Sequence, residues 1–161
     1  KSLDFIGLRG LSLVCNAAYI HSRVRFEEGA PERDRPLAGQ SPYLVNAGLF
    51  YQHDDKRISA SLLYNRIGKR IESVGVPMQD QNEDIPDIYE MPRNSLDLTF
   101  SKKIGKAVEI KAGIQDMLNS KIEYKQFVKL TDQNGGKRER EQLVRSYRPG
   151  VDINVGVSLK F

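Results

Sequence analysis

The sequence predicts an all-β fold, an antiparallel up-and-down sheet that forms a segment of a transmembrane β-barrel. The last eleven residues, Val151–Phe161, alternate apolar and polar without a break. Successive side chains of a strand point to opposite faces, so this strand has one apolar and one polar face. Its length fits the roughly 9–11 residues of a tilted membrane-spanning strand. The connections between the expected strands alternate short and long, as in barrels of bacterial outer membranes.

The composition is compatible with this fold. The chain has 161 residues, 39% hydrophobic and 29% charged, and contains no run of eighteen apolar residues that would form a spanning helix. A barrel strand needs only every second residue to be apolar, so a polar composition does not exclude it. The lysines and arginines that give the net charge of +4 are scattered, which does not favour a nucleic-acid partner. Cys15 stands alone and excludes an internal disulfide.

Three strands are expected in the first half of the chain, and a seventh strand of the sheet is expected to end within Lys1–Ile6. The first alternates through Leu13, Cys15, Ala17 and Tyr19. Apolar residues also fall on the polar face of the first and third strands, a pattern that favours a plugged lumen over an open aqueous channel. These residues are Val14, Ile20, Leu63 and Ile67. The three strands are expected at Leu11–Phe26, Tyr43–Gln52 and Ile58–Val74.

Three more strands are expected in the second half, at Asn94–Ile104, Val108–Phe127 and Val151–Phe161. In the fourth strand Leu96, Leu98 and Phe100 are expected to face lipid. In the fifth, Val108, Ile110, Ala112 and Ile114 should do so, with Glu109, Lys111, Gly113 and Gln115 on the other face. Asp116 then falls on the lipid side, where a carboxylate is costly. We therefore expect a bulge at 116–119 that shifts the register.

The connections give the sheet two different rims. Tight turns rich in Gly, Asp and Lys are expected at 7–10, 53–57 and 105–107. Long polar loops are expected at Glu27–Ser41, Val76–Arg93 and Val128–Arg148. Every second connection lies on the same side of an up-and-down sheet, so the short turns share one rim and the long loops the other. In an outer-membrane barrel this places Phe161 at the periplasmic rim and the long loops outside.

Aromatic residues are expected near both interfaces, and the sheet needs further strands. Tyr51, Phe100 and Phe161 fall toward the inner rim, and four tyrosines toward the outer one: Tyr19, Tyr43, Tyr64 and Tyr124. The smallest outer-membrane barrels have eight strands, and unpaired edges are not tolerated in hydrocarbon. The missing strands are expected to come from sequence before Lys1 or from other chains, which makes 1–161 a fragment.

Four stretches, in this order, resemble the C-terminal part of TonB-dependent outer-membrane receptors of Bacteroidetes-like bacteria. They are Arg35–Leu49, Leu63–Ile71, Tyr89–Leu98 and Gly113–Tyr124, and the resemblance extends from about Lys1 to Phe161. In the last stretch 116–119 stands where the family often has Asn-Leu-Phe-Asp, followed by a Tyr.

The resemblance implies the last six strands of a 22-stranded barrel whose lumen holds an N-terminal plug. Such receptors import scarce ligands, namely metal chelates, haem, cobalamin or oligosaccharides, with energy from the TonB complex acting on the plug. The implied partners are the upstream strands and plug, the TonB complex, outer-membrane lipid and lipopolysaccharide, and the barrel assembly machinery. Phe161 matches the terminal aromatic residue that this machinery recognises. No ligand-binding residue is assigned by the resemblance.

Nothing in the sequence favours an enzyme, a cofactor or a metal site. His21 and His53 fall at opposite rims, and no phosphate-binding glycine loop or nucleophile motif is present. Asp80, Asn82 and Asp84 alternate as at the start of a calcium loop, but Ile85 stands where that loop needs Gly, so a solvated loop tip is favoured. The basic segment 132–148 is a candidate contact for anionic lipopolysaccharide or ligand, with plain solvation favoured.

Two other functions stay open at this point. A passive porin or adhesin barrel would share the same strands, and a plug encoded upstream of Lys1 would distinguish the transporter from it. A soluble β-sandwich or lipocalin-like binding module would use the alternation for an ordinary core. In that case the apolar stripes would pack against a second sheet or a helix.

Overall fold

The computed structural model describes residues 9–30, 34–78, 84–131 and 136–159. In these residues the chain is all-β, with antiparallel sheets and no helix, as the sequence predicts. Within the same ranges, therefore, no helix is available that could cross a membrane. The strands are β1 (Leu11–Tyr19), β2 (Tyr43–His53), β3 (Ile58–Ile67), β4 (Arg70–Ser73), β5 (Ile88–Glu90), β6 (Arg93–Ile104), β7 (Val108–Gln115), β8 (Ile122–Thr131), β9 (Lys137–Tyr147) and β10 (Asp152–Leu159).

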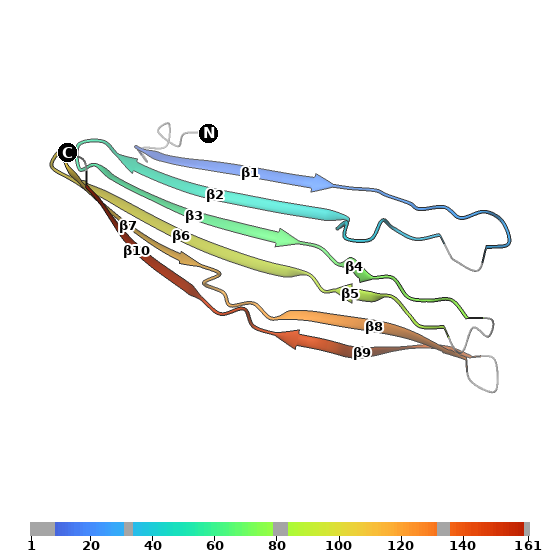
Figure 1. Ribbon diagram of the computed structural model, residues 1–161. Helices are drawn as coiled ribbons and strands as arrows, with labels where there is room; N and C mark the ends of the chain where they lie inside the picture. The colour runs from blue at the N-terminus through green and yellow to red at the C-terminus, as the bar shows by residue number, and fades with distance from the viewer. Residues whose placement is uncertain (1–8, 31–33, 79–83, 132–135, 160–161) are drawn as a thin grey trace.

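The strands form two sheets that lie end to end. The first, here called the long sheet, has six strands in the order β1-β2-β3-β6-β7-β10. The second, the distal sheet, has the order β4-β5-β8-β9. Each distal strand directly precedes or follows a strand of the long sheet, so the distal sheet extends the long strands past one end (Figure 1). The connections β2–β3 and β6–β7 lie at the opposite end, which confirms that these two short turns share one end of the sheet. The strand end expected within Lys1–Ile6 and most of the turn expected at 7–10 lie outside the described residues.

One face of the long sheet is apolar because the strands pair in a register that aligns their apolar positions. A single row across all six strands contains only leucine and isoleucine, and its members are Leu13, Leu49, Leu62, Leu98, Ile114 and Ile153. The next row contains Tyr51, Phe100 and Val155 with two alanines. We call this side the apolar face. It carries the residues that the sequence assigns to lipid in the fourth, fifth and last strands.

The opposite side, the polar face, carries short hydrogen-bonding side chains. The Ser61 and Thr99 hydroxyls lie 2.6 Å apart across β3 and β6, and the Ser59 and Ser101 hydroxyls lie 2.8 Å apart one row away. The side-chain amide of Asn65 donates to the Asn46 side-chain oxygen across β2 and β3. Cross-strand pairs of this kind each stabilise a sheet by roughly 0.2–1 kcal/mol.

The boundary between the two sheets does not exchange the faces. Ile67 pairs with Arg93 and Arg70 pairs with Glu90, so both strands advance three residues and the register is unchanged. Pro92 has no backbone N–H to donate, which explains why the hydrogen-bonded ladder is interrupted there. Because side chains alternate with period two, the face that carries Arg66 continues to Arg70.

The expected irregularity at 116–119 is present, as an inserted turn. Leu98 pairs with Ile114, and Glu90 pairs with Tyr124. The chain therefore advances eight residues from Glu90 to Leu98 but ten from Ile114 to Tyr124, so the segment between β7 and β8 contains two extra residues. Asp116 and Asn119 adopt positive φ angles of 50° and 42°, and the Asn119 amide donates to the Asp116 carbonyl at 2.7 Å. The Asp116 carboxylate lies 3.8 Å from the Arg93 guanidinium. Since Arg93 has the parity of the polar face, the turn directs this carboxylate away from the apolar face.

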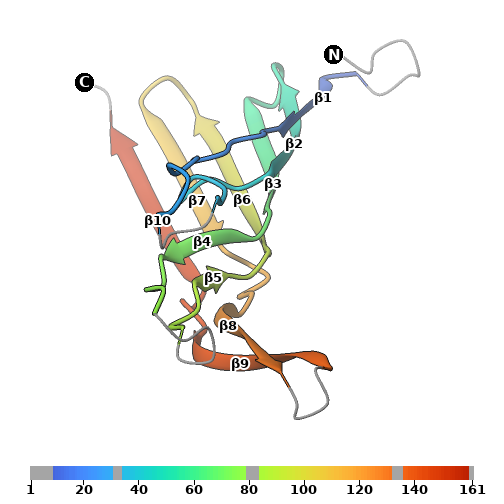
Figure 2. The same ribbon diagram turned by 90° about the vertical axis from the view of Figure 1, so that its right-hand side faces the viewer.

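Neither face of the long sheet is covered by a second layer of the described residues (Figure 2). Ile153 and Val155 are 70% and 72% exposed, and the buried apolar side chains of the described residues are Ile71, Ile122 and Tyr124. All three belong to the distal sheet. The long sheet is open, with β1 and β10 each paired on one side only, so the structure shows no closed barrel.

Five expected boundaries were wrong. The first strand ends at Tyr19, the third is interrupted after Ile67, and the fifth is divided into β7 and β8. The loop expected at Val76–Arg93 contains β5. The segment 128–148, expected as a long loop, is mostly the β8–β9 hairpin. Alternation of apolar and polar residues does not reveal this hairpin, because β9 begins Lys-Arg-Glu-Arg-Glu and alternates between positive and negative charge.

The register predicts a specific crosslink. In a Cys15→Ser background of the full-length protein, Ser61→Cys with Thr99→Cys should form a disulfide under mild oxidation. Directly opposed residues have Cα atoms about 4.5–5.5 Å apart, within the range for a disulfide. Ser61→Cys with Ser101→Cys, displaced by two residues, should crosslink far less. Mobility on non-reducing gels after proteolysis between β3 and β6 measures both, and a stronger crosslink in the displaced pair would contradict the register.

Candidate functional site

An aromatic and cationic cluster lies on the polar face of the distal sheet. Lys69, just before β4, Tyr89 in β5 and Phe127 in β8 form it. The Lys69 ammonium lies 4.1 Å from the centre of the Tyr89 ring and 3.9 Å from that of Phe127. The two rings meet edge to face with centroids 5.7 Å apart. Such cation–π contacts stabilise by about 0.5–2 kcal/mol, depending on how far the cation is desolvated.

Tyr89 is the most perturbed group of this cluster. Partial burial of the phenol is the largest cause that raises its pKa above the usual 10.0, and the Asp87 carboxylate adds to it. The Tyr89 hydroxyl donates to Asp87 Oδ2 at 3.3 Å, while Asp87 Oδ1 accepts the Gly75 amide at 2.8 Å. The phenol therefore stays protonated and its ring is held in place by the loop before β5.

A charged ladder continues along the same face of β8 and β9. The Lys125 ammonium lies 2.6 Å from Glu141 and 3.4 Å from Glu123, which also contacts Lys121 at 3.4 Å. The hydrogen bond to Glu141 is the largest cause that raises the pKa of Lys125, and the bond from Lys121 is the largest cause that lowers the pKa of Glu123. The positive and negative charges of this ladder largely compensate each other.

A second feature is an apolar patch in the middle of the polar face of the long sheet. Val14, Gly48 and Leu63 oppose one another in β1, β2 and β3, and the Phe50 ring lies over Gly48. A Cβ on Gly48 would come within 2.7 Å of that ring, so the ring occupies the space that glycine leaves free. The patch lines a shallow hollow of about 320 Å³ together with asparagines and Asp97.

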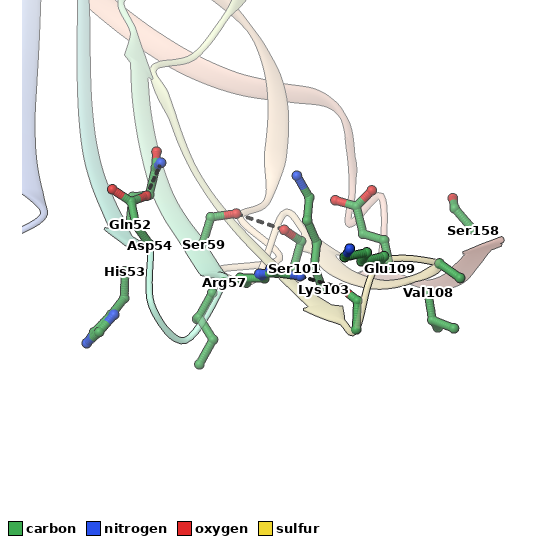
Figure 3. Close-up of a pocket in the computed structure, with 14 residues that line it drawn as sticks. Gln52, His53, Asp54, Arg57, Ser59, Ser101, Lys103, Val108, Glu109 and Ser158 are labelled. Atoms are coloured by element: carbon green, nitrogen blue, oxygen red, sulfur yellow. Dashed lines mark hydrogen bonds between the residues drawn. The ribbon is translucent and has the colours of Figure 1, made fainter. Parts of the chain in front are cut away.

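A larger hollow of about 560 Å³ lies at the turn end of the polar face. Figure 3 shows Gln52, Ser59, Ser101, Lys103 and Glu109 around it, with His53 pointing away. The Arg57 guanidinium donates to the Gly105 carbonyl at 2.5 Å and so joins the two adjacent turns. The Gln52 side chain donates to Asp54 at 2.8 Å.

These surfaces are suited to hydrogen bonding and stacking. In the described ranges no group of three His, Cys, Asp or Glu side chains is placed to hold a metal ion. His53 Nδ1 accepts the Lys56 amide within its turn at 3.3 Å, and His21 lies beyond β1 at the other end of the sheet. Of the calcium-like loop, Asp84 is described, and its carboxylate accepts the Met78 amide at 2.8 Å. Phe161 and the range 79–83 lie outside the described residues.

The basic residues of segment 132–148 lie at different positions in the structure. Arg138, Arg140 and Arg145 share a face in β9, and Arg148 donates to the Asn119 carbonyl at 2.7 Å. The sequence analysis did not find the cluster of Lys69, Tyr89 and Phe127. These residues are separated by 20 and 38 positions, and only the strand register brings them together. No model of a known protein family, no curated protein and no solved structure matches this chain.

Replacing Asp87 by asparagine should lower the pKa of Tyr89. The substitution removes a negative charge that disfavours the tyrosinate and leaves an oxygen for the Gly75 amide, so the pKa should fall toward its usual 10.0 but stay above it because the ring remains partly buried. A 13C-tyrosine NMR titration of the full-length protein, assigned with Tyr89→Phe, measures this. Glu72→Gln, whose carboxylate contacts Arg145, is the control and should leave it unchanged. A rise of the pKa in Asp87→Asn would contradict the assigned cause.

Proposed function

We propose that this chain is part of the wall of a TonB-dependent outer-membrane transporter. The apolar face meets lipid, the polar face lines the lumen, and the distal sheet extends into the external medium. The observation that carries the proposal is the unbroken register of apolar rows across six strands, over which the described residues form no second layer. A water-soluble sheet with two uncovered faces would leave those rows in water, at a cost of roughly 25 cal/mol for each Å² of apolar surface.

The open edges of the long sheet support a larger barrel. Within the described residues, the outer edges of β1 and β10 have no neighbouring strand. Backbone groups of a spanning strand need partners because hydrocarbon offers none. We propose that further strands close the wall, as in the 22-stranded barrels of this receptor class, and that the lumen holds a plug.

The polar face supports a filled lumen. Val14, Phe50 and Leu63 are 53%, 39% and 39% exposed on a face that otherwise carries mostly polar and charged side chains. An open aqueous channel gives no reason for exposed apolar side chains at this place, whereas a plug domain packed against the wall would bury them. This observation favours the energised transporter over a passive porin. The imported ligand would be a metal chelate, haem, cobalamin or an oligosaccharide.

The lipid-facing assignment predicts unequal effects of two neighbouring substitutions. Val155 lies in the apolar row with Phe100, and Asn154 points to the other side. In the complete barrel Val155→Lys should reduce the free energy of unfolding, by up to roughly 2–4 kcal/mol at the bilayer centre, because an ammonium that faces lipid loses its hydration. Asn154→Lys is the matched control and should cost much less. Urea titration in lipid vesicles measures both, and equal losses would exclude the assignment.

Two experiments on the full-length protein distinguish the transporter from a passive barrel. A TonB-dependent receptor should bind the purified periplasmic domain of TonB through its plug, which is measurable by calorimetry. Reconstituted in liposomes, it should not admit arabinose, because the plug closes the lumen. If the liposomes swell rapidly in arabinose and the protein does not bind TonB, the transporter proposal is wrong and a passive porin is favoured.

A further inference from the structure

The hydrogen-bonded ladders stop along one line between the long sheet and the distal sheet. The chain crosses this boundary four times, at 68–69, 91–92, 116–121 and 148–151. Among the described residues no strand pair continues through a crossing, and the crossings follow one another in an oblique line across the sheet (Figure 1). Pro92 and Pro149 have no N–H for a ladder bond. The two sheets are therefore joined without the backbone pairing that stiffens each of them.

The backbone bonds at the boundary each attach a crossing to one sheet. The Met117 amide donates to the Leu96 carbonyl of the long sheet at 2.8 Å. The Met91 amide donates to the Glu123 carbonyl of the distal sheet at 2.9 Å. In the part of the chain that the structure describes, no backbone bond joins a strand of the long sheet to a strand of the distal sheet. The angle between the two sheets is therefore not fixed by main-chain hydrogen bonds.

Side chains tie two of the crossings together, and Asn119 is the centre of these contacts. Its carbonyl accepts the Arg148 guanidinium at 2.7 Å, and its side-chain oxygen accepts the Gly150 amide at 3.1 Å. These bonds hold the crossing at 116–121 beside the crossing at 148–151. Arg148 and Gly150 are exposed, so water competes for both bonds. Asn119 is therefore a restraint that can be released.

The turn at 116–119 is also attached to β6, through Asp116. Its amide donates to Asp97 Oδ1 at 2.8 Å, and its Oδ2 lies 3.8 Å from the Arg93 guanidinium. Its other oxygen, Oδ1, is buried and has no hydrogen-bond partner among the described residues. A buried acceptor without a partner is destabilising, and a tilt that admits water to it would remove this cost. The polar groups at the boundary are thus not all satisfied in the observed arrangement.

The distal sheet, in contrast, is firmly connected within itself. Arg70 donates to Glu90 Oε2 through Nε at 2.9 Å and through a terminal nitrogen at 2.7 Å, and Glu90 is buried. Strand β5 pairs with both β4 and β8, and β8 pairs with β9 along its whole length. The small core of the distal sheet and the cluster around Lys69 add side-chain contacts between the strands. A change at the boundary therefore moves the distal sheet as a whole.

We propose that the boundary is a hinge about which the distal sheet tilts as one body relative to the long sheet, with Asn119 as its restraint. Hinges in proteins are formed by a few residues at the ends of secondary-structure elements, and all four crossings are of this kind. A tilt carries the cluster of Lys69, Tyr89 and Phe127 with it and changes its distance from the polar face of the long sheet. The inference does not rest on the proposed function, because it follows from the ladders and the side-chain contacts alone.

The test measures distances between pairs of spin labels by double electron–electron resonance, in the full-length protein carrying Cys15→Ser. Two pairs span the hinge, Ile153→Cys with Arg140→Cys and Ile153→Cys with Ser73→Cys. The pair Ile153→Cys with Leu13→Cys lies within the long sheet and is the reference. All four labelled positions are exposed. The distance distributions of both hinge pairs should be about twofold or more broader than that of the reference pair, as expected for a hinged body.

Substitutions of Asn119 test the restraint. Asn119→Gly removes the side-chain oxygen that accepts the Gly150 amide and is compatible with the positive φ of 42° at this position. It should broaden both hinge distributions further and leave the reference pair unchanged. Asn119→Asp keeps a side-chain oxygen and is the matched control, which should resemble the unmodified protein. If Asn119→Gly also broadens the reference pair, Arg148→Gln, which leaves the turn at 116–119 intact, takes its place in the same comparison.

The outcomes separate the hinge from the proposed function. Hinge pairs as narrow as the reference pair, in the unmodified protein and in Asn119→Gly alike, overturn the hinge. Broadening confined to the pair that includes Arg140→Cys overturns the motion as one body, because then the β8–β9 hairpin moves alone. Equal broadening in Asn119→Gly and Asn119→Asp overturns the role of Asn119. A full-length protein that forms no membrane-inserted barrel overturns the proposed function, and the same label distances then decide on the hinge in solution.

Discussion

The parity of strand pairing is the constraint on which the rest of the structure depends. A shift by one residue would move every side chain of a strand to the other face. Within the long sheet the register has no shift at all, and the turn at 116–119 inserts two residues, which preserves parity. Odd shifts occur only in the distal sheet, at Ile71/Ser73 and beside Tyr124/Lys125. The register is thus kept where exposed apolar rows depend on it and relaxed beyond them.

The same constraint explains why the distal sheet holds the only small core of the described residues. Beyond the apolar rows the faces no longer need to be uniform, so bulges are tolerated and aromatic side chains pack locally. Ile71, Ile122 and Tyr124 are buried there beside charged groups such as Glu90. The long sheet, in contrast, has no interior of its own among the described residues. In the barrel proposed above, lipid and neighbouring strands would supply the contacts that the long sheet lacks.

The parts of the fold that sequence predicted are those with alternating hydrophobicity. The register that aligns Leu98 with Ile114 follows from the tight turn at Gly105, and the costly position of Asp116 revealed the inserted turn. The β8–β9 hairpin was missed because Arg138 and Arg140 alternate with glutamates, a pattern of charge and not of hydrophobicity. The cluster around Lys69 could not be predicted, because it depends on how β4, β5 and β8 pair. The ladder is interrupted at Pro92, and the sequence does not indicate that the same register resumes beyond it.

Charge sorting in β9 is informative because plain solvation does not require it. A hairpin surrounded by water on both faces could distribute arginine and glutamate on either side, and opposed pairs across the sheet would favour mixing. Here Arg138 and Arg140 oppose Val128 and Leu130 on β8 and not acidic residues, while Glu139 and Glu141 lie on the side of Lys125. The two sides of the hairpin therefore carry different residues, arginine with aliphatic positions on one side and glutamate with Lys125 on the other.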